Sequence, residues 1–266
     1  MKHITYLSCI FLLYSIQLRS QLSEFPDFND YSKVGFSIRP VLYSKAIIKN
    51  NYGDYKLTSQ KTPGINFGFE YLIHPERAWA YKTGLHLDIV PLFNYNFTIR
   101  EGDVSPEYNN NEVVVKMSPK LNFTVPALVQ FKKQMAYNVY FNLETGLNIM
   151  LMEKGTIESS NTFISKGGKE QTIFAIHADT KSPLVVYPNV IISPGFYFAF
   201  NGILIQGNVI YQKPLIAFFE GEYAFDNLKV SQPTKGTYKI NGEYLGLQFS
   251  VHLKRNKKNR QLLRTI

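Results

Sequence analysis

Two histidine–aspartate pairs have the residue types needed for acid–base chemistry. His86 and Asp88 lie in the segment 78–90, and His177 and Asp179 lie in a polar connection. A spacing of two puts the imidazole and the carboxylate on one face of a strand, where they could share a proton. Neither pair has a nucleophile nearby at a diagnostic spacing. We therefore expect ordinary polar side chains and no enzymatic activity, and a lipid-modifying enzyme that uses His177 is the less favoured alternative.

Four further charged residues interrupt apolar segments: Arg39, Glu70, Lys82 and Glu144. In the segment 137–150, YNVYFNLETGLNIM, Glu144 lies on the face opposite an apolar stripe. A carboxylate in a narrow protein interior must be paired or hydrogen-bonded. We therefore expect these two cations and two anions to form a salt-bridge network that plugs the interior, which His86 and Asp88 also face. An ion path or gate through the same charges is the alternative.

The elements that position these side chains are predicted to be β-strands. Eight segments alternate apolar and polar residues with period two, and no comparable stretch has helical spacing. They are 33–43, 64–73, 78–90, 121–131, 137–150, 189–200, 202–211 and 244–253. Aromatic residues make up 15% of the chain, which also favours strands.

The connections between these segments alternate in length. Three are tight turns, and four are long, at about 44–63, 91–120, 151–188 and 212–243. Short turns at one end and long loops at the other are typical of barrels that span a membrane. The sequence therefore predicts an all-β protein. Its fold is an eight-stranded antiparallel up-and-down transmembrane β-barrel over 33–253, with short periplasmic turns and long extracellular loops.

A soluble barrel with apolar residues inside would show the same alternation and is the alternative fold. The polar face here carries glycine, asparagine and a few opposed charges, whereas soluble barrels expose many Lys and Glu. The aromatic residues also exceed what a small barrel interior could hold. Several aromatics lie beside the short turns, where an interfacial girdle is expected: Tyr71, Trp79, Tyr81 and Phe131. The membrane barrel, surrounded by outer-membrane lipids, is favoured.

The two ends of the chain predict export. Residues 1–20 contain Lys2 and then an apolar run, which is typical of a signal peptide, and Cys9, the sole cysteine, lies within it. We expect a periplasmic segment over 21–32 and a basic periplasmic tail over 254–266, with the protein in the cell outer membrane. The tail carries most of the net charge of +9. Export and the lack of a motif argue against binding to nucleic acid, and no metal-spaced cluster or phosphate loop predicts a cofactor or a metal.

The long connections are the remaining candidates for function. They mix Asn and Gly with Tyr and Phe, a composition suited to contacts with other proteins or with glycans. The strongest candidate is 214–223, because Phe218, Phe219 and Tyr223 would need covering if they were exposed. The alternative is that these residues cap the barrel mouth, and both interpretations stay open.

Three units of the sequence resemble one known family. They are LNFTVPALVQFKK with YNVYFNLETGLNIML, YPNVIISPGFYFAF and EYLGLQFSVHL. These units resemble the eight-stranded outer-membrane β-barrel family of Bacteroidetes, also described as PorT-like, over nearly all of the mature chain. The chain departs from the family in the basic tail after Leu253 and in the length of its loops, above all 151–188. The resemblance implies the fold and says almost nothing of activity.

The predicted function is non-enzymatic. We expect binding or assembly with other outer-membrane or periplasmic envelope proteins through the extracellular loops. A pore for small solutes or ions is the main alternative.

Overall fold

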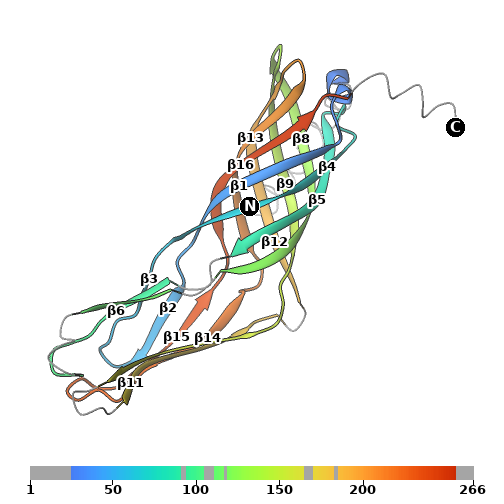
Figure 1. Cartoon of the computed structure of the whole chain (residues 1–266). Coiled ribbons are helices and arrows are strands. Elements are labelled where there is room, and N and C mark those ends of the chain that lie inside the picture. The colour runs from blue at the N-terminus through green and yellow to red at the C-terminus, as the bar shows by residue number, and fades with distance from the viewer. Residues whose placement is uncertain are drawn as a thin grey trace, which may run out of the picture.

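The computed structural model describes residues 25–90, 94–104, 111–116, 119–164, 170–182 and 185–255. Eight antiparallel strands close into a barrel in the order β1-β16-β13-β12-β9-β8-β5-β4 (Figure 1). They are β1 (Val34–Tyr43), β4 (Thr62–Ile73), β5 (Trp79–Val90), β8 (Lys120–Ala136), β9 (Val139–Leu151), β12 (Val186–Ala199), β13 (Ile203–Pro214) and β16 (Tyr244–Leu253). The predicted strands and the fold class are confirmed. The predicted signal peptide and nearly all of the basic tail lie outside the described residues.

Strand β1 shows why these segments form a closed sheet. Its residues alternate between exposed and buried along the whole strand, with Phe36 and Ile38 outward and Ser37 and Arg39 inward. Unpaired backbone groups cannot be satisfied in lipid, and β1 avoids this by pairing with β4 on one side and β16 on the other. A slip of one residue would turn Arg39 towards lipid, so the alternation fixes the register.

The end of the barrel with the short connections, which we call the turn end, also holds the first described residues. There a 3-10 helix, η1 (Pro26–Asp30), lies against the barrel (Figure 1). Tyr31 forms a bridge with Lys254, and the backbone N–H of Ser32 donates to the carbonyl of Leu253 at 2.7 Å. The described part of the chain contains no helix that is long and apolar enough to cross a membrane.

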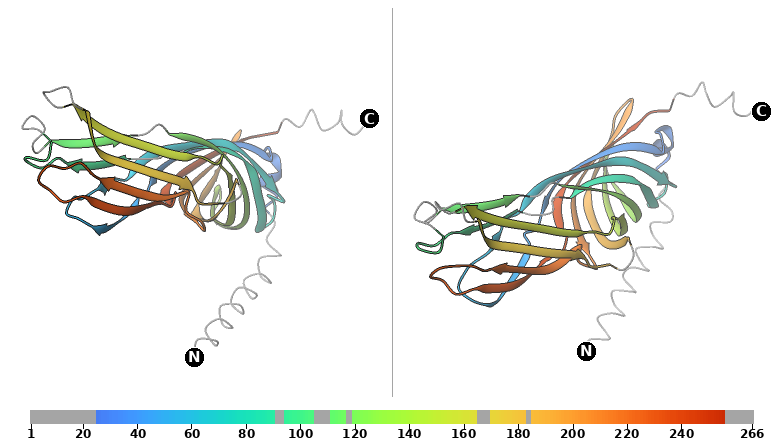
Figure 2. Two further views of the ribbon diagram at one scale, coloured as in Figure 1. Left: turned by 90° about the horizontal axis from the view of Figure 1, so that it is seen from below. Right: turned by 60° about the horizontal axis from the view of Figure 1, so that its bottom comes forward.

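The long connections at the other end contain strands of their own, which the sequence did not predict. A five-stranded sheet has the order β10-β11-β14-β15-β2, and a three-stranded sheet has the order β3-β6-β7 (Figure 2). Together we call them the extension. Its strands are β2 (Ile47–Tyr52), β3 (Thr58–Ser59), β6 (Asn94–Thr98), β7 (Glu112–Lys116), β10 (Thr156–Ile164), β11 (Glu170–Thr180), β14 (Phe219–Phe225) and β15 (Thr234–Ile240). Each follows or precedes one barrel strand, so the extension prolongs the barrel wall.

The two sheets of the extension enclose an aromatic core. Tyr55 stacks on Phe225 with ring centres 4.7 Å apart, and Phe97 lies 4.9 Å from Phe174. The same buried cluster continues into the barrel mouth through Tyr43 and its neighbours. The extension is therefore packed as a folded unit that closes the barrel at this end.

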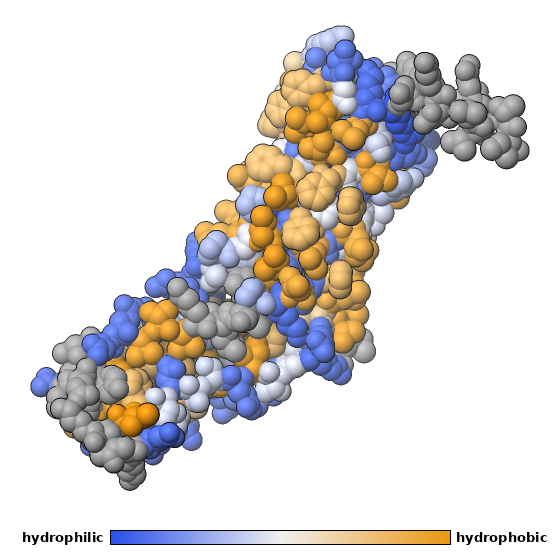
Figure 3. Space-filling view, viewed as in Figure 1, coloured by the Kyte–Doolittle hydropathy of each residue, from blue (hydrophilic) through white to orange (hydrophobic). Residues whose placement is uncertain are grey.

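Apolar side chains cover the outer face of the barrel, while hydrophilic residues gather at the turn end and on parts of the extension (Figure 3). Phe69 and Leu121 are each 61% exposed, and Leu245 is 57% exposed. A continuous band of such large exposed side chains is unusual for a protein in water and matches the lipid-facing band of a membrane barrel.

Candidate functional site

Four charged side chains meet in the middle of the barrel interior. An Arg39 guanidinium nitrogen lies 3.0 Å from Glu70 Oε1, and Lys82 Nζ lies 3.3 Å from Glu70 Oε2 and 2.6 Å from Glu144 Oε1. All four side chains are fully buried. Their charges alternate in sign, so each buried ion has a partner of opposite charge to offset its desolvation. The structure thus brings together the four charges that the sequence singled out.

Glutamines from three strands add hydrogen bonds to this network. Gln248 of β16 donates to Glu70 at 3.0 Å, and Gln130 of β8 and Gln206 of β13 donate to Glu144 at 2.8 and 2.5 Å. The ammonium of Lys82 on β5 also lies 3.4 Å from the Gln206 amide oxygen. In the strand order β5 and β13 are opposite one another, so the contact between Lys82 and Gln206 crosses the lumen.

His86 and Asp88 face the same interior, as the sequence predicted. His86 Nε2 lies 3.4 Å from an Arg39 guanidinium nitrogen, and the hydroxyl of Thr124 donates to Asp88 at 2.6 Å. Both side chains are fully buried, so a lipid or polymer substrate cannot contact them. We therefore assign this pair to the packing of the lumen.

Aromatic rings close the interior at the turn end, a feature that the sequence did not predict. Phe28 packs edge-on against Tyr140 and Tyr197, with ring centres 4.9 and 5.3 Å apart, and Phe25 lies 5.4 Å from Tyr140. The ammonium of Lys132 lies 4.1 Å from the centre of the Phe28 ring, within range of a cation–π contact. We call these five residues the turn-end plug. Part of the predicted periplasmic segment 21–32 thus contributes to the barrel interior.

A closed sheet of eight strands with a filled polar interior and an apolar outer face is the architecture of small outer-membrane β-barrels. The fold is a transmembrane β-barrel. No known family model matches the chain, and no curated protein matches its sequence. Among solved structures, it is similar to the outer membrane protein OprG from Pseudomonas aeruginosa, with 13% identity and a TM-score of 0.41, over 83% of this chain and 96% of that one. The resemblance to the Bacteroidetes PorT-like family stays a prediction.

The second histidine–aspartate pair lies on the exposed face of the five-stranded sheet. His177 Nδ1 lies 3.0 Å from Glu158 Oε1, and His177 Nε2 lies 3.4 Å from Asp179 Oδ2. The hydrogen bond with Glu158, and then the charge of Asp179, raise the pKa of His177. The Thr156 hydroxyl donates to Asp179 at 2.6 Å and lowers the pKa of that carboxyl. Both ring nitrogens of His177 thus face carboxylates, which leaves neither nitrogen to activate a nucleophile.

The described residues contain no arrangement that is typical of a metal site. No group of three or more His, Cys, Asp or Glu side chains there is arranged to hold a metal ion.

Phe218, Phe219 and Tyr223 are not exposed, so the prediction that they form a loop contact is wrong. Their side chains are 0%, 1% and 2% exposed. The ring of Phe218 lies 5.5 Å from that of Tyr187. The physical reason is that β14 is a central strand of the five-stranded sheet and turns Phe219, Tyr223 and Phe225 towards the core of the extension. Their burial agrees with the alternative interpretation, in which they cap the barrel mouth.

Among the residues that the structure describes, four strands of the extension have a ladder partner on one side only: β2, β3, β7 and β10. The edges of β7 and β10 border one opening in the wall. β10 pairs with β11 and β7 pairs with β6, and within the described residues neither has a ladder partner on its other side. Their continuations β8 and β9 do pair, up to Phe123 opposite Leu151, so the wall opens beyond that point. Ile164 of β10 and Val114 of β7 are 59% and 51% exposed. We call this opening the β7/β10 seam, and its unpaired backbone groups are a template for a further strand.

Sequence reasoning missed Lys132 because the predicted strand ended at Phe131, whereas β8 runs to Ala136. The signal was available, since Gln130 and Lys132 continue the alternation of the inner face. The seam had no such signal, because an edge is defined by which strands fail to pair.

Proposed function

We propose that this protein is a non-enzymatic outer-membrane β-barrel that fills its own lumen and presents the extension at the cell surface, where it binds or assembles with other envelope proteins. The observation that carries the proposal is the β7/β10 seam: a packed extension beyond the apolar band leaves the strand edges of β7 and β10 without a ladder partner in the described residues. Outer-membrane barrels keep short turns in the periplasm and longer connections outside, which supports an extracellular extension.

Strand addition is the recognition mode that suits this seam. A partner strand laid along Thr156–Ile164 would pair with the backbone groups of β10 that β11 leaves free. The exposed side chains of Ile164 and Val114 would give such a partner apolar surface to cover. Assembly through the seam replaces the contact that was expected from Phe218 and Phe219.

Proline substitution tests the seam. Successive N–H groups of a strand point to opposite sides, so of Ser159 and Ser160 one donates towards β11 and the other towards the open edge. Ser159→Pro and Ser160→Pro are therefore made separately, and the variant that keeps the wild-type melting temperature is the edge variant. In a detergent pull-down from native outer membranes, followed by mass spectrometry, we expect a stoichiometric partner with wild type and its loss with the edge variant.

Ser159→Ala and Ser160→Ala are the matched controls, because alanine keeps the backbone donor, and both should retain the partner. If the wild type comes out alone, or if the folded proline variant keeps the partner, binding through the seam is refuted.

A lipid-modifying enzyme is the less favoured function. Each ring nitrogen of His177 lies beside a carboxylate, that of Glu158 or that of Asp179. A general base needs a free nitrogen directed at the group that it deprotonates. We expect His177→Ala to leave the lipid composition of the outer membrane unchanged, and an altered acylation or phosphate pattern would favour the enzyme instead.

A further inference from the structure

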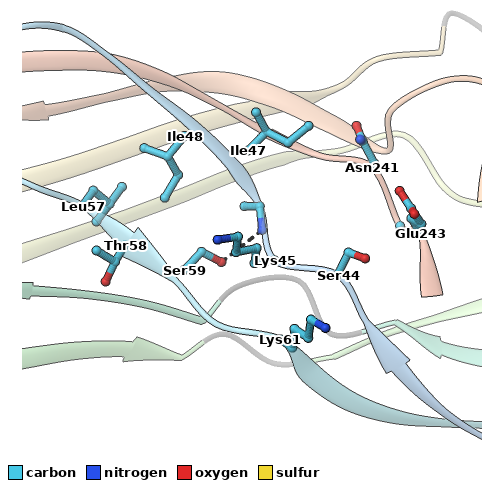
Figure 4. A pocket seen from close by; sticks show the side chains of 12 residues that line it. Ser44, Lys45, Ile47, Ile48, Leu57, Thr58, Ser59, Lys61, Asn241 and Glu243 are labelled. Atoms are coloured by element: carbon cyan, nitrogen blue, oxygen red, sulfur yellow. Dashed lines mark hydrogen bonds between the residues drawn. The ribbon is translucent and has the colours of Figure 1, made fainter. Parts of the chain in front are cut away.

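A pocket opens in the wall where the barrel meets the extension, on the side formed by β1 and β4. These strands pair as far as Tyr43 opposite Thr62 and then separate: β2 goes on to pair with β15, and β3 with β6. The backbone N–H of Ala46 donates to the Ser59 hydroxyl at 3.1 Å across the gap. We call this gap the β2/β3 seam. It holds a pocket of about 580 Å³ (Figure 4).

The pocket lies at the edge of the lipid-facing band. Leu42 and its register partner Leu245 are exposed on the outer face of the barrel. Lys45 follows Leu42 by three residues and lies in the connection between β1 and β2. The pocket is therefore next to the end of the apolar band, where the headgroup region of a surrounding membrane is expected.

The side chains around the pocket combine cations with apolar surface (Figure 4). Lys45 and Lys61 are exposed beside it, and within the described residues neither makes an ion pair. Ile47, Ile48 and Leu57 line its apolar part.

The one carboxylate in the lining does not cancel this charge. Glu243, which accepts a hydrogen bond from the Tyr211 hydroxyl at 2.7 Å, contributes one negative charge against the two positive charges of Lys45 and Lys61. On the neighbouring outer surface, Lys239 is the register partner of Ile47, and Lys49 is exposed two residues further along β2. The surroundings of the pocket are therefore cationic.

We propose that the β2/β3 seam is a binding site for a phosphate-bearing lipid of the surrounding leaflet. Lys45 and Lys61 pair with the headgroup phosphate at the pocket, and Leu42 and Leu245, on the barrel side of these lysines, contact the first carbons of the lipid tail. Lysines near an anionic lipid surface attract it electrostatically. The position at the edge of the apolar band selects a membrane lipid over a soluble phosphate. This site is separate from the β7/β10 seam, so it holds whether or not a protein partner binds there.

The test uses purified full-length protein in nanodiscs of phosphatidylcholine that contain a small fraction of diphosphorylated lipid A. After release into mild detergent, native mass spectrometry counts the lipid A retained per protein. We expect wild type to retain lipid A over phosphatidylcholine and Lys45→Gln/Lys61→Gln to weaken retention by roughly fivefold per lysine. Leu42→Asn should weaken it without a change of charge, because Leu42 lies on the barrel side of the two lysines.

Lys154→Gln/Lys213→Gln is the matched control. Both lysines are exposed and lie outside the pocket lining: Lys213 is near the end of β13, and Lys154 is in the connection between β9 and β10. This variant removes the same charge and should retain lipid A as wild type does. An equal loss in control and pocket variants would show general surface attraction and overturn the site, as would full retention in the pocket variant.

Two further outcomes separate the lipid from other occupants. Displacement of lipid A by millimolar inorganic phosphate would indicate a soluble phosphate site and overturn the lipid assignment. A co-purifying peptide that fills the seam and excludes lipid A would do the same. Since the measurement uses no partner protein, failure of the partner pull-down leaves this result unaffected.

Discussion

At the residue scale, Lys82 is the residue that joins the two carboxylates of the charge network in the lumen. It is the cation between two buried carboxylates, with Nζ 3.3 Å from Glu70 and 2.6 Å from Glu144. Arg39 gives Glu70 a second cationic partner, whereas amide donors are the other hydrogen-bonding partners of Glu144. Removal of Lys82 would therefore leave Glu144 as a buried charge with no ionic partner.

We expect Lys82→Met to lower the free energy of unfolding by about 3–5 kcal/mol, because one partner of a buried pair is lost. Urea unfolding of the barrel in liposomes measures the change. The double variant Lys82→Met/Glu144→Gln should recover part of the loss, since the unpaired charge is gone. Lys133→Met, on an exposed lysine of the same chain, is the control. Wild-type stability in Lys82→Met would contradict the network.

Asp103 accepts hydrogen bonds that connect three segments of the extension. Its carboxylate accepts hydrogen bonds from the Tyr55 hydroxyl at 2.7 Å and from the N–H and hydroxyl of Ser231 at 2.6 and 2.7 Å. Burial alone would raise the pKa of Asp103, but the bonds from Ser231 and Tyr55 outweigh it and lower the pKa below its usual value. The segment after β6 is thereby tied to the connection between β14 and β15.

A lowered folded-state pKa fixes the sign of the pH dependence. The contribution of Asp103 to stability is complete above the unfolded-state pKa and is lost as pH falls through the folded-state pKa. We expect amide hydrogen exchange around 226–233 to become faster in that acid range. At neutral pH, Asp103→Asn should lower the local stability of this segment by about 1–3 kcal/mol and so make its exchange faster. Asp54→Asn, at an exposed position, should change neither. Unchanged exchange in Asp103→Asn would show that the hydrogen bonds of Asp103 do not stabilise this segment.

At the scale of elements, the same strands serve two environments. β1, β4, β5, β8, β9, β12, β13 and β16 put apolar residues into lipid, and their prolongations in the extension turn apolar residues inward to a core. The change happens where the ladder opens into the β2/β3 and β7/β10 seams. At the turn end, the helix η1 and the residues beside it fill the barrel interior, as the core of the extension does at the other end.

Phe28 tests the turn-end plug. It is 2% exposed and packs on two tyrosine rings and Lys132. We expect Phe28→Ala to destabilise the docked segment 25–31 by about 3–5 kcal/mol, the usual cost of removing a buried aromatic ring. Hydrogen exchange by mass spectrometry should show faster exchange of that segment. Phe36→Ala on the lipid-facing surface should leave it protected, and equal protection in both variants would contradict docking.

At the scale of the whole molecule, the lumen is occupied from end to end. The turn-end plug closes one mouth, the charge network spans the middle, and the aromatic core of the extension closes the other mouth. A barrel of eight strands has an interior just wide enough for its own side chains. The molecule is thus a filled barrel with an extension of two further sheets.

This arrangement predicts no ion conduction. In planar bilayers the purified protein should give no stable ohmic current. The double variant Phe25→Ala/Phe28→Ala, which thins the plug alone, should still give none, because the charge network remains in place. A steady wild-type current that Glu144→Gln alters would identify an ion path through the lumen and refute the proposed non-conducting barrel.

The sequence by itself determined the barrel, because period-two alternation is a local property: Glu144 lies opposite an apolar stripe whatever it contacts. The same alternation placed Arg39, Glu70 and Lys82 on the inner face. It could not determine their partners, since Lys82 and Gln206 meet across 124 residues of chain. Tertiary structure alone decided that Phe218 is buried, that Phe28 enters the barrel and that two seams stay open. Each of these depends on which distant strands pair and which do not, and no short stretch of sequence contains that information.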